Sequence, residues 1–468
     1  MIGTVNRAVS FPSIRDLATQ RAQGGGEDVI AALRAQYERY ADLLKPYITH
    51  SSDWSSGTHL EPADENSVGL LGVPVSVKDL FGVPGFPTYA GSPARLPAQF
   101  EESGPVVQTL QRRGAAITGK THTVEFAFGG LGFNSHWPVP RNPWDNGAYR
   151  VSGGSSAGAG VSLYCDARLA LGTDTAGSVR IPASMTGVVG LKTSYGRWPM
   201  SGIVPLCPSL DSTGLLGHTV ADVRYAFDVI DRGLGNSAEP GVTELPDLGA
   251  LRFGIADELF WNECDAGVGE AVRGALAELE SAGLRCTPNP LPEAQPALDI
   301  FKLGHLAAPE LFEFLTTELP SWLPTLDPTV AARIQDAATT TAYEYLRRRR
   351  ILSELSCRAD ARLAGIDVLV TPTVAITPPR LDDIAEPEAY RRANMRALRN
   401  TAVANLLGLC AITLPVGLDD QGLPVGLQLI TRHGCDQWLL AVAESVERQL
   451  GAAHDRLGSP PALRKPGS

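Results

Sequence analysis

One lysine in this sequence follows a run of residues that would bury it. Only six of the 40 Lys and Arg residues are lysines. Lys78 comes directly after Gly-Val-Pro-Val-Ser-Val, in which alternate valines would face a core. A lysine at the end of a strand usually extends to water. If it stays in the core instead, burial lowers its pKa from about 10.4 toward 7, at a cost of roughly 4 to 5 kcal/mol, and the neutral amine becomes a base.

Two glycine-rich segments contain serines that could act as the nucleophile for such a base. Ser155 and Ser156 lie in Gly-Gly-Ser-Ser-Ala-Gly, and Ser178 lies in Gly-Thr-Asp-Thr-Ala-Gly-Ser-Val-Arg. Each serine alone is more typical of a turn or a helix cap. A serine hydroxyl is a weak nucleophile until a neighbouring base takes its proton. A serine and a buried lysine therefore make chemical sense together.

The second of these segments could also bind a developing negative charge. If the loop curls, the peptide N–H groups of Thr175–Ser178 converge on one point, which is the geometry of an oxyanion hole. Asp174 and Arg180 bracket the loop and could hold its curvature through a bidentate ion pair. The many glycines between 126 and 217 would let the main chain approach such a site, although tight turns between buried strands use glycine too.

A different serine hydrolase pattern overlaps the first segment. Gly154–Gly158 fits Gly-x-Ser-x-Gly, the turn that presents the nucleophile of α/β-hydrolases, and that turn directly follows a strand. The preceding residues, Trp-Asp-Asn-Gly-Ala-Tyr-Arg-Val-Ser, are typical of turns instead. The histidine partner of such an enzyme would have to come from a set with no distinctive setting: His218, His305, His433 and His454. The sequence therefore disfavours this mechanism.

The composition indicates a globular protein and makes some partners improbable. Hydrophobic residues make up 44% and charged residues 19% of the 468 residues, which suits a packed core rather than a disordered chain. The net charge is −11, and the only basic run is Arg347–Arg350, so we expect no nucleic acid partner. The seven cysteines form no Cys-x-x-Cys pair and are expected to be reduced.

The sequence also lacks the motifs of several cofactor and membrane classes. It contains no phosphate-binding loop, no dinucleotide-binding glycine motif and no His-Glu-x-x-His, so we expect neither a nucleotide cofactor nor a metal. The N-terminal stretch lacks the apolar central region that a signal peptide requires. No run of apolar residues approaches the roughly 18 that are needed to span a bilayer. We therefore expect a cytoplasmic protein with no membrane contact.

Helical periodicity alternates with short β-branched runs along most of the chain. Such alternation is typical of an α/β fold with a largely buried sheet. Helices are expected at 28–44, 220–230, 268–279, 338–355 and 438–450, and strands at 73–77, 251–256, 367–374, 411–418 and 424–431. Loops are expected at 24–26, 51–67, 233–246 and after 458.

Taken together, these residues resemble the amidase signature family. The resemblance lies in segments that follow one another in the family's order: GVPVSVKDLFGVPGFPTYAGSP at 72–93, GKTHTVEFAFG at 119–129, RNPWD at 141–145, SGGSSAGAG at 152–160, LGTDTAGSVRIPASMTGVVGLKTSYGR at 171–197, DSTGLLGHTVAD at 211–222, DVLVTPT at 367–373 and LPVGLQLI at 423–430.

The resemblance implies a fold and an activity. The fold would be one compact α/β domain, with a mixed, twisted sheet covered by helices on both faces. We expect that domain at 26–456, between an N-terminal arm at 1–25 and a C-terminal tail at 457–468. The activity would be cofactor-free hydrolysis of the C–N bond of a small-molecule amide, through an acyl-enzyme and a Ser-cisSer-Lys triad. Homodimers are frequent among the enzymes that it resembles, so a homodimer is compatible with the resemblance.

The resemblance also assigns roles to individual residues. Ser178 matches the nucleophile, Ser155 the bridging serine with the cis peptide, and Lys78 the base. The main chain at Ala127 matches a stretch that contacts substrate. The oxyanion donors fall on Thr175, Ala176, Gly177 and Ser178.

Some positions depart from the family's pattern. The spacing between Ser155 and Ser178 is one residue shorter than usual, so the intervening helix is expected to differ in length. Ala176 replaces a frequent glycine, which is tolerable if its φ is negative. His218 stands where Arg is usual. His122 lies where the family often has Asn, and we expect a hydrogen-bonded structural histidine there rather than a substrate contact.

The sequence favours a small or aryl carboxamide as substrate and leaves two alternatives. Hydrolysis of ureido or carbamoyl compounds of the allophanate or biuret type would use the same triad. A glutaminase subunit of a tRNA-dependent amidotransferase normally carries an Ala-Arg-Tyr-Asp-Gly segment that is absent here. Aromatic and histidine side chains could line an acyl pocket, although most are expected to be ordinary core: Phe126, Phe128, Phe133, Trp137, Phe301, His305, Phe312, Phe314 and Trp322.

Overall fold

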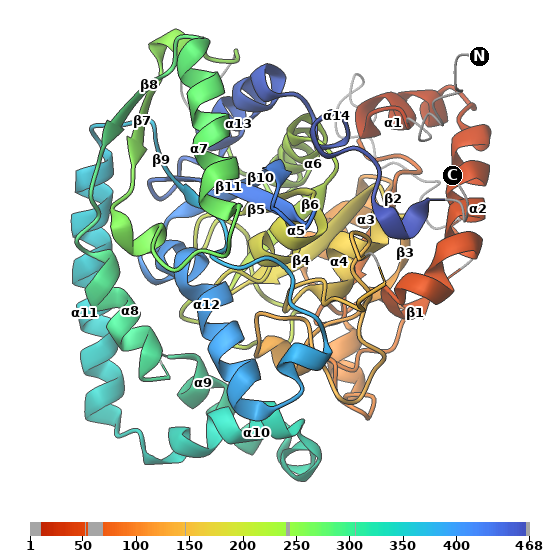
Figure 1. Ribbon diagram of the computed structural model, residues 1–468. Helices are drawn as coiled ribbons and strands as arrows, with labels where there is room; N and C mark the ends of the chain where they lie inside the picture. Colours follow the sequence, from red (N-terminus) through yellow and green to blue (C-terminus); the bar gives the residue numbers. More distant parts are fainter. Residues whose placement is uncertain are drawn as a thin grey trace.

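A mixed β-sheet crosses the molecule (Figure 1). The computed structural model describes residues 11–51, 53–54, 69–145, 147–239, 244–304 and 306–464. Within them the sheet has 11 strands, in the order β1-β3-β2-β4-β6-β5-β10-β11-β9-β7-β8. Their bounds are β1 Tyr47–His50, β2 Pro74–Lys78, β3 Ala116–Thr121, β4 Leu169–Asp174, β5 Val189–Lys192, β6 Ser212–Gly217, β7 Arg252–Ile255, β8 Arg285–Pro288, β9 Val368–Pro372, β10 Cys410–Leu418 and β11 Pro424–Thr431.

Helices surround this sheet. The α-helices are α1 Ile14–Ala22, α2 Glu27–Leu44, α3 Pro105–Arg112, α4 Ala157–Ser162, α5 Arg180–Thr186, α6 Val220–Gly233, α7 Val268–Ser281, α8 Ala294–Lys302, α9 Ala307–Glu318, α10 Pro328–Gln335, α11 Ala342–Leu363, α12 Pro387–Leu406, α13 Asp436–Leu450 and α14 Ala453–Leu457. Short 3₁₀ turns are η2 Ala98–Glu101, η3 Glu125–Ala127, η4 Leu248–Ala250, η5 Glu258–Phe260, η6 Pro320–Thr325, η7 Asp336–Thr339, η8 Asp382–Ile384 and η9 Pro461–Leu463.

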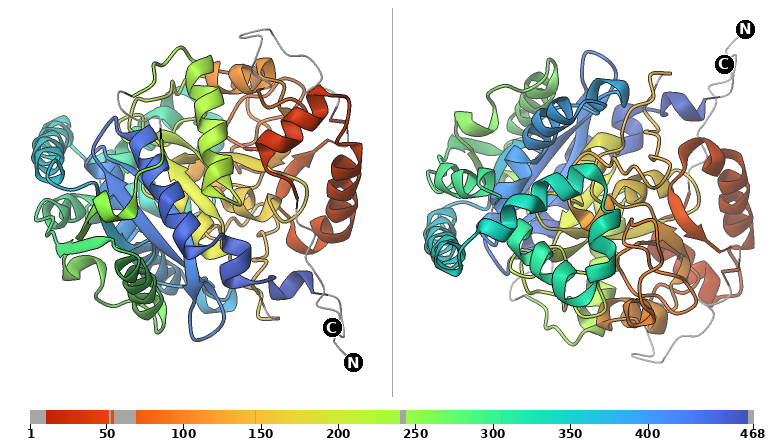
Figure 2. Two further views of the ribbon diagram at one scale, coloured as in Figure 1. Left: turned by 90° about the horizontal axis from the view of Figure 1, so that it is seen from above. Right: turned by 90° about the horizontal axis from the view of Figure 1, so that it is seen from below.

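Each face of the sheet has its own hydrophobic core. Because successive strand residues point to opposite faces, Ile412 of β10 joins a core with α6, α7 and α13, while the adjacent Ala411 joins a second core with α8 to α12. Figure 2 shows α6 and α13 in front of the sheet from above, and α9 and α10 in front of it from below. The expected α/β fold, with a mixed sheet covered on both faces, is confirmed.

The helices and strands expected from periodicity are present, with shifted ends. The largest shift is at α11, which begins at Ala342 rather than 338 and ends at Leu363 rather than 355. Its start is set by a cap, because the Thr341 side chain accepts the N–H of Glu344. α4, which lies between Ser155 and Ser178 in the sequence, has 6 residues.

Both ends of the described chain pack on the rest of the molecule. The expected N-terminal arm contains α1, which buries Ile14 and Leu17. The N–H of Ile14 also donates to Asp222 of α6 at 2.8 Å. Near the other end, the Tyr40 hydroxyl donates to the carbonyl of Leu463 at 3.0 Å. Of the expected loop at 51–67, only residues 51, 53 and 54 lie within the described residues.

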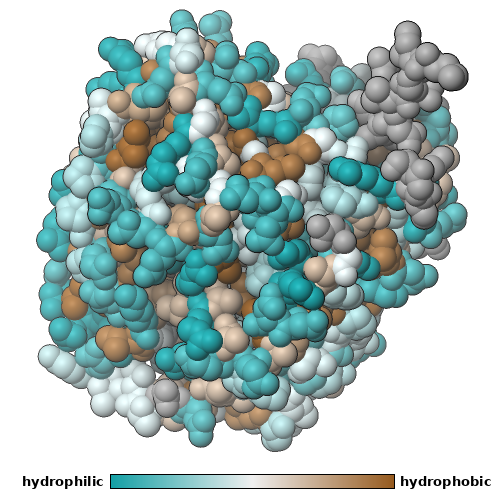
Figure 3. Space-filling view, viewed as in Figure 1, coloured by the Kyte–Doolittle hydropathy of each residue, from teal (hydrophilic) through white to brown (hydrophobic). Residues whose placement is uncertain are grey.

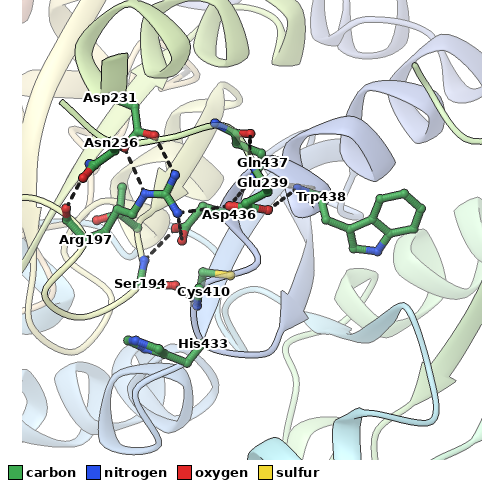
Figure 4. Close-up of polar contacts among 12 residues, drawn as sticks. Ser194, Arg197, Asp231, Asn236, Glu239, Cys410, His433, Asp436, Gln437 and Trp438 are labelled. Carbon is green, nitrogen blue, oxygen red and sulfur yellow. Dashed lines mark hydrogen bonds and ion pairs between the residues drawn. The ribbon is translucent and has the colours of Figure 1, made fainter. Parts of the chain in front are cut away.

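A charged network ties α6 to α13 on one face of the sheet (Figure 4). Arg197, in the loop after β5, pairs with Asp231 of α6 at 2.6 Å and with Glu239 at 3.1 Å. Its guanidinium also lies 3.9 Å from Asp436, the first residue of α13. Because Asp231 and Asp436 are buried, these contacts compensate charges that would otherwise be costly to desolvate.

The surface is mostly hydrophilic, with small separate apolar patches in the face drawn in Figure 3. Among the described residues, the large hydrophobic side chains that are exposed are Leu43, Tyr195, Leu303, Tyr343, Leu346 and Leu418. None of the described helices combines the length and the apolar character that crossing a bilayer requires.

Candidate active site

Lys78 is the last residue of β2 and is completely buried. β2 is an interior strand that pairs in parallel with β3 on one side and β4 on the other, so its side chains cannot reach solvent at a sheet edge. The Lys78 amine donates to the Ser155 hydroxyl at 2.7 Å and to the Thr173 hydroxyl at 2.8 Å. The lysine therefore stays in the core, as the catalytic interpretation of the sequence requires.

The environment of Lys78 favours its neutral form. Burial lowers the pKa of Lys78 from 10.5 to about 7, although the negative charges of Asp211 and Asp174 oppose the shift. A large fraction of the amines is therefore uncharged at pH 7. A neutral amine that contacts a hydroxyl can accept its proton, which is the action of a general base.

Ser155 joins the lysine to the second serine segment. The peptide bond between Gly154 and Ser155 is cis. The Ser155 carbonyl accepts the N–H groups of Val124 at 3.1 Å and of Ala157, the first residue of α4, at 2.8 Å. The N–H of Ser156 donates to the Ser178 carbonyl at 3.2 Å, which places the two segments side by side. Among the hydrogen bonds of the described residues, none joins the Ser155 hydroxyl to the Ser178 hydroxyl.

The loop that carries Ser178 curls around the carboxylate of Asp174. Asp174 accepts the N–H groups of Gly177 at 2.7 Å and Val179 at 3.1 Å. It also forms the predicted bidentate pair with Arg180, at 3.0 and 2.9 Å. Burial disfavours the charged carboxylate, but Arg180 and Lys192 prevail and lower the pKa of Asp174. The Asp174 and Arg180 clamp predicted from the sequence is confirmed.

The loop leaves some, but not all, of the expected oxyanion donors free. The N–H of Gly177 is bonded to Asp174, so it is already satisfied here. Within the described chain, the N–H groups of Ala176 and Ser178 donate to no protein acceptor. Ala176 keeps φ out of the left-handed region, so replacing the family's glycine at this position causes no backbone strain.

Several residues that support this loop were not singled out from the sequence. Asp211 accepts the Thr175 hydroxyl at 2.5 Å and the N–H groups of the 206–207 turn. Thr401 of α12 donates to the Ala176 carbonyl at 2.7 Å, and Asn405 donates to Asp174 at 2.9 Å. Asp211 was inside a segment that resembles the family. Thr401 and Asn405 have no local pattern that would mark them.

The segment expected to contact substrate lies next to Ser155. Ala127 is in η3 and has φ of 59°. The N–H of Gly130 donates to Asn394 of α12 at 2.7 Å, and the Gly130 carbonyl accepts the N–H of Gly154 at 2.9 Å. Because Gly154 directly precedes Ser155, these bonds hold residues 125–130 against Ser155.

His122 does not have the hydrogen-bonded ring that was expected. It is buried, and neither ring nitrogen has a hydrogen-bond partner among the described residues. Its backbone is bonded instead, to Pro46 and Gly158, each at 2.9 Å. Burial lowers the pKa of His122 from 6.5 to about 3, so the ring is neutral at pH 7. The expectation of a hydrogen-bonded ring is therefore wrong for the described residues, because no donor or acceptor among them reaches either ring nitrogen.

The geometry of Ser156 contradicts the α/β-hydrolase pattern. No strand runs directly into the Gly154–Gly158 segment. The Ser156 hydroxyl donates to the Thr173 carbonyl at 3.3 Å, rather than to a histidine. His218 contacts the Leu163 carbonyl, and His433 the Gly408 carbonyl. His305 lies outside the described residues.

The aromatic candidates mostly belong to one core, as expected. Phe126, Phe128 and Phe301 are buried in the core that the sheet forms with α8 to α12. The Trp137 indole N–H donates to the Ser92 carbonyl at 3.0 Å. The others are partly buried against the same core: Phe133, Phe312, Phe314 and Trp322. Among the described residues, no group of three or more His, Cys, Asp and Glu side chains could hold a metal ion.

A sequence model of the family described as Amidase matches residues 28–440. The chain belongs to the amidase family. It is 50% identical over 392 residues to a 2-amino-5-chloromuconic acid deaminase of Comamonas testosteroni, and the match covers 84% of each chain. It is 31% identical over 434 residues to mandelamide hydrolase of Pseudomonas putida, with 84% of this chain and 81% of that relative covered.

A solved structure described as a crystal structure of amidase has a similar fold. The two chains share 27% sequence identity and a TM-score of 0.76, over 93% of this chain and 99% of the other. The family match and these relatives together identify the protein described here by its sequence as an amidohydrolase that acts on C–N bonds.

Proposed function

We propose that this amidase hydrolyses a small or aryl carboxamide through an acyl-enzyme on Ser178, with Ser155 and Lys78 as the proton relay. The observation that carries the proposal is the contact of 2.7 Å between a completely buried amine and the Ser155 hydroxyl. A charged, solvated lysine could not act as a base at neutral pH.

The cycle begins with proton transfer along the relay. Neutral Lys78 takes the Ser155 proton as Ser155 takes the proton of Ser178, and the Ser178 oxygen bonds to the amide carbon. The free N–H groups of Ala176 and Ser178 stabilise the resulting oxyanion. The relay then returns the proton to the leaving nitrogen as the C–N bond breaks. A water molecule repeats these steps, releasing the acid and restoring Ser178.

The names of two relatives support a reaction in which this protein releases ammonia from its substrate. One is named for removing an amino group from an acid, and the other for hydrolysing an amide. Both names describe loss of nitrogen from a small organic molecule. We therefore propose a primary amide of a small carboxylic acid as the first substrate class to examine, ahead of ureido compounds and glutamine.

A substrate panel tests this proposal. The panel contains aryl and aliphatic primary amides, anilides, urea derivatives and glutamine, and both ammonia and amine release are measured. We expect primary amides to be hydrolysed with stoichiometric ammonia. Faster turnover of an allophanate-type compound would favour the ureido alternative. Glutamine hydrolysis only in the presence of a partner chain would favour the glutaminase alternative.

We also propose that the protein acts in the cytoplasm, as a homodimer. All seven cysteines are free, which suits a reducing compartment. Light scattering on the purified protein measures the oligomeric state, and fractionation of the source cells measures the compartment.

A further inference from the structure

The helix α12, which is labelled in Figure 1, buries three polar side chains on one face. Asn394, Thr401 and Asn405 are spaced by seven and four residues, which are about two turns and one turn of an α-helix, so their side chains share a face. They are 4%, 0% and 3% exposed. Polar groups that are buried this deeply need hydrogen-bond partners. We call these three residues the α12 polar stripe.

The middle residue of the stripe holds the main chain just before the proposed nucleophile. The Thr401 hydroxyl donates to the Ala176 carbonyl at 2.7 Å. At the other end of the same peptide unit, the N–H of Gly177 donates to Asp174 at 2.7 Å. Because a peptide unit is planar, holding both of its ends fixes its orientation. The proposed oxyanion donors, the N–H groups of Ala176 and Ser178, flank this unit, so its orientation sets their placement.

Asn405 ties the same loop to α12 one turn later. Its amide group donates to the Asp174 carbonyl and to the Asp174 carboxylate, each at 2.9 Å. Its side-chain oxygen accepts Nη2 of Arg180 at 2.6 Å. The helix therefore contacts the Ser178 loop both at the Ala176 carbonyl and at the clamp that Asp174 forms with Arg180.

Asn394 reaches the segment of the bridging serine instead. Its side-chain oxygen accepts the N–H of Gly130 at 2.7 Å. The Gly130 carbonyl accepts the N–H of Gly154, which directly precedes Ser155, at 2.9 Å. A Cβ atom at Gly130 would lie 3.0 Å from Leu398 of α12, so the helix and this segment are closely packed. One helix therefore holds both serine segments.

The proposed relay depends on the distance between these two segments. Proton transfer requires the Ser155 and Ser178 hydroxyls to be within hydrogen-bond reach. The segments contact each other directly where the N–H of Ser156 donates to the Ser178 carbonyl at 3.2 Å. A helix that is bonded to both segments adds a second constraint on their separation.

We infer that the α12 polar stripe positions the relay: Thr401 and Asn405 hold the side of the nucleophile, and Asn394 holds the side of the bridging serine. The three are positioning residues, because they act through the main chain of the serine segments. The inference rests on the proposed function and adds that losing one of these contacts slows the chemical step while substrate binding persists.

Labelling of Ser178 tests the inference without an amide substrate. When phenylmethanesulfonyl fluoride reacts with an activated serine, the serine oxygen bonds to sulfur, fluoride leaves, and the hydroxyl proton passes through the relay to solvent. The mass of the intact protein measures the rate. The wild type should be labelled and Ser178→Ala should not. Thr401→Val removes the hydroxyl but keeps the shape, and should be labelled roughly 10- to 100-fold more slowly.

Two further variants show whether this loss comes from the contact. Thr401→Ser keeps the hydroxyl and should be labelled within about threefold of the wild-type rate. Thr431→Val is the matched control, because Thr431 is 3% exposed and its hydroxyl donates to the Asp367 carbonyl at 2.9 Å, in another part of the core. It should also stay within about threefold. Equal labelling rates in Thr401→Val and Thr431→Val would overturn the inference.

A double variant tests whether the two sides of the stripe act together. Asn394→Leu should also slow labelling roughly 10- to 100-fold. Combined with Thr401→Val, it should add no more than about threefold to the slower single variant, because both changes disturb the same separation. Losses that multiply would show that the two side chains support independent segments, and would contradict the inference. If Thr401→Val does not fold, Thr401→Ala replaces it with the same expected loss.

Hydrolysis of the best amide of the panel separates this inference from the proposed function. Thr401→Val should lower kcat roughly 10- to 100-fold and leave KM within about threefold, whereas Thr431→Val should leave both unchanged. If no amide is hydrolysed but labelling depends on Thr401, the proposed function fails and the positioning role stands. If amides are hydrolysed with equal kcat by Thr401→Val and Thr431→Val, the positioning role is wrong and the function stands.

Discussion

The amine of Lys78 lies 2.7 Å from the hydroxyl of Ser155, and neither side chain is accessible to solvent. The two residues are far apart in the sequence and meet because β2 ends where α4 begins. Burial and contact together give the lysine the pKa of a base near neutral pH and give that base a hydroxyl to act on.

Removal of the proposed nucleophile should abolish turnover. Ser178→Ala is expected to lower kcat by at least about 10⁴-fold, because only substrate binding and the oxyanion donors would remain. Ammonia release from the best amide of the panel measures this loss. Ser156→Ala is the control, because Ser156 would be the nucleophile only in the α/β-hydrolase pattern. An inactive Ser156→Ala protein with an active Ser178→Ala protein would reverse the assignment.

The pH dependence of activity should follow the ionisation of Lys78. The base acts when neutral, so kcat/KM is expected to rise with pH through about 7, the pKa that burial produces. A profile of kcat/KM between pH 5 and about 9, with a substrate that does not titrate in this range, measures the midpoint. Activity that falls as pH increases through 7 would contradict the role of Lys78 as a base.

The same lysine should make stability depend on pH. The pKa of Lys78 is about 7 in the folded protein, and about 10.4 in the unfolded chain. Between these values the unfolded chain binds more protons, so stability increases as pH rises. Relative to Lys78→Met, the free energy of unfolding of the wild type should increase by about 1.4 kcal/mol per pH unit between about pH 7.5 and 10.

Denaturant unfolding of the wild type and Lys78→Met at several pH values in this window measures the difference. Taking the difference between the two proteins removes the effect of other titrating groups, among them Lys192. A difference that does not change with pH would show that Lys78 is charged in the folded protein.

Loss of the Asp174 carboxylate should damage both folding and activity. Asp174→Asn removes one charge of a completely buried pair and leaves Arg180 uncompensated. Breaking such a pair costs about 3 to 5 kcal/mol. Thermal and denaturant unfolding should show this loss of stability. If a double variant with Arg180→Met recovered stability but not activity, the clamp would be shown to position the Ser178 loop as well.

Close packing at Gly177 should make this position intolerant of a side chain. A Cβ there would lie 2.1 Å from the Thr401 hydroxyl, and φ is 131°. Gly177→Ala is expected to lower kcat by about 100-fold or more, as small displacements of catalytic groups do. Gly196→Ala is the matched control, because Gly196 also has positive φ, of 75°, but no atom within 4 Å of its Cβ position. Similar activity in both variants would contradict a packing requirement at Gly177.

Local patterns predicted the parts of the site whose cause is local. The alternating valines before Lys78 placed the lysine at the end of a buried strand, and glycines marked the two loops. Asp174 and Arg180 are close in the sequence, so their pairing followed from spacing and charge. The same holds for most helices and strands, because periodicity reflects which side of an element is buried.

Contacts between distant segments decided the rest. Thr401 and Asn405 approach the Ser178 loop from α12, more than 200 residues later in the sequence. Arg333 and Tyr390 reach Gly129 from two different helices. The packing around His122 leaves its ring without a hydrogen-bond partner among the described residues. The sequence determined the residue types and local shapes, but packing of whole elements determined which of them meet, because hydrogen bonds and burial depend on neighbours in space.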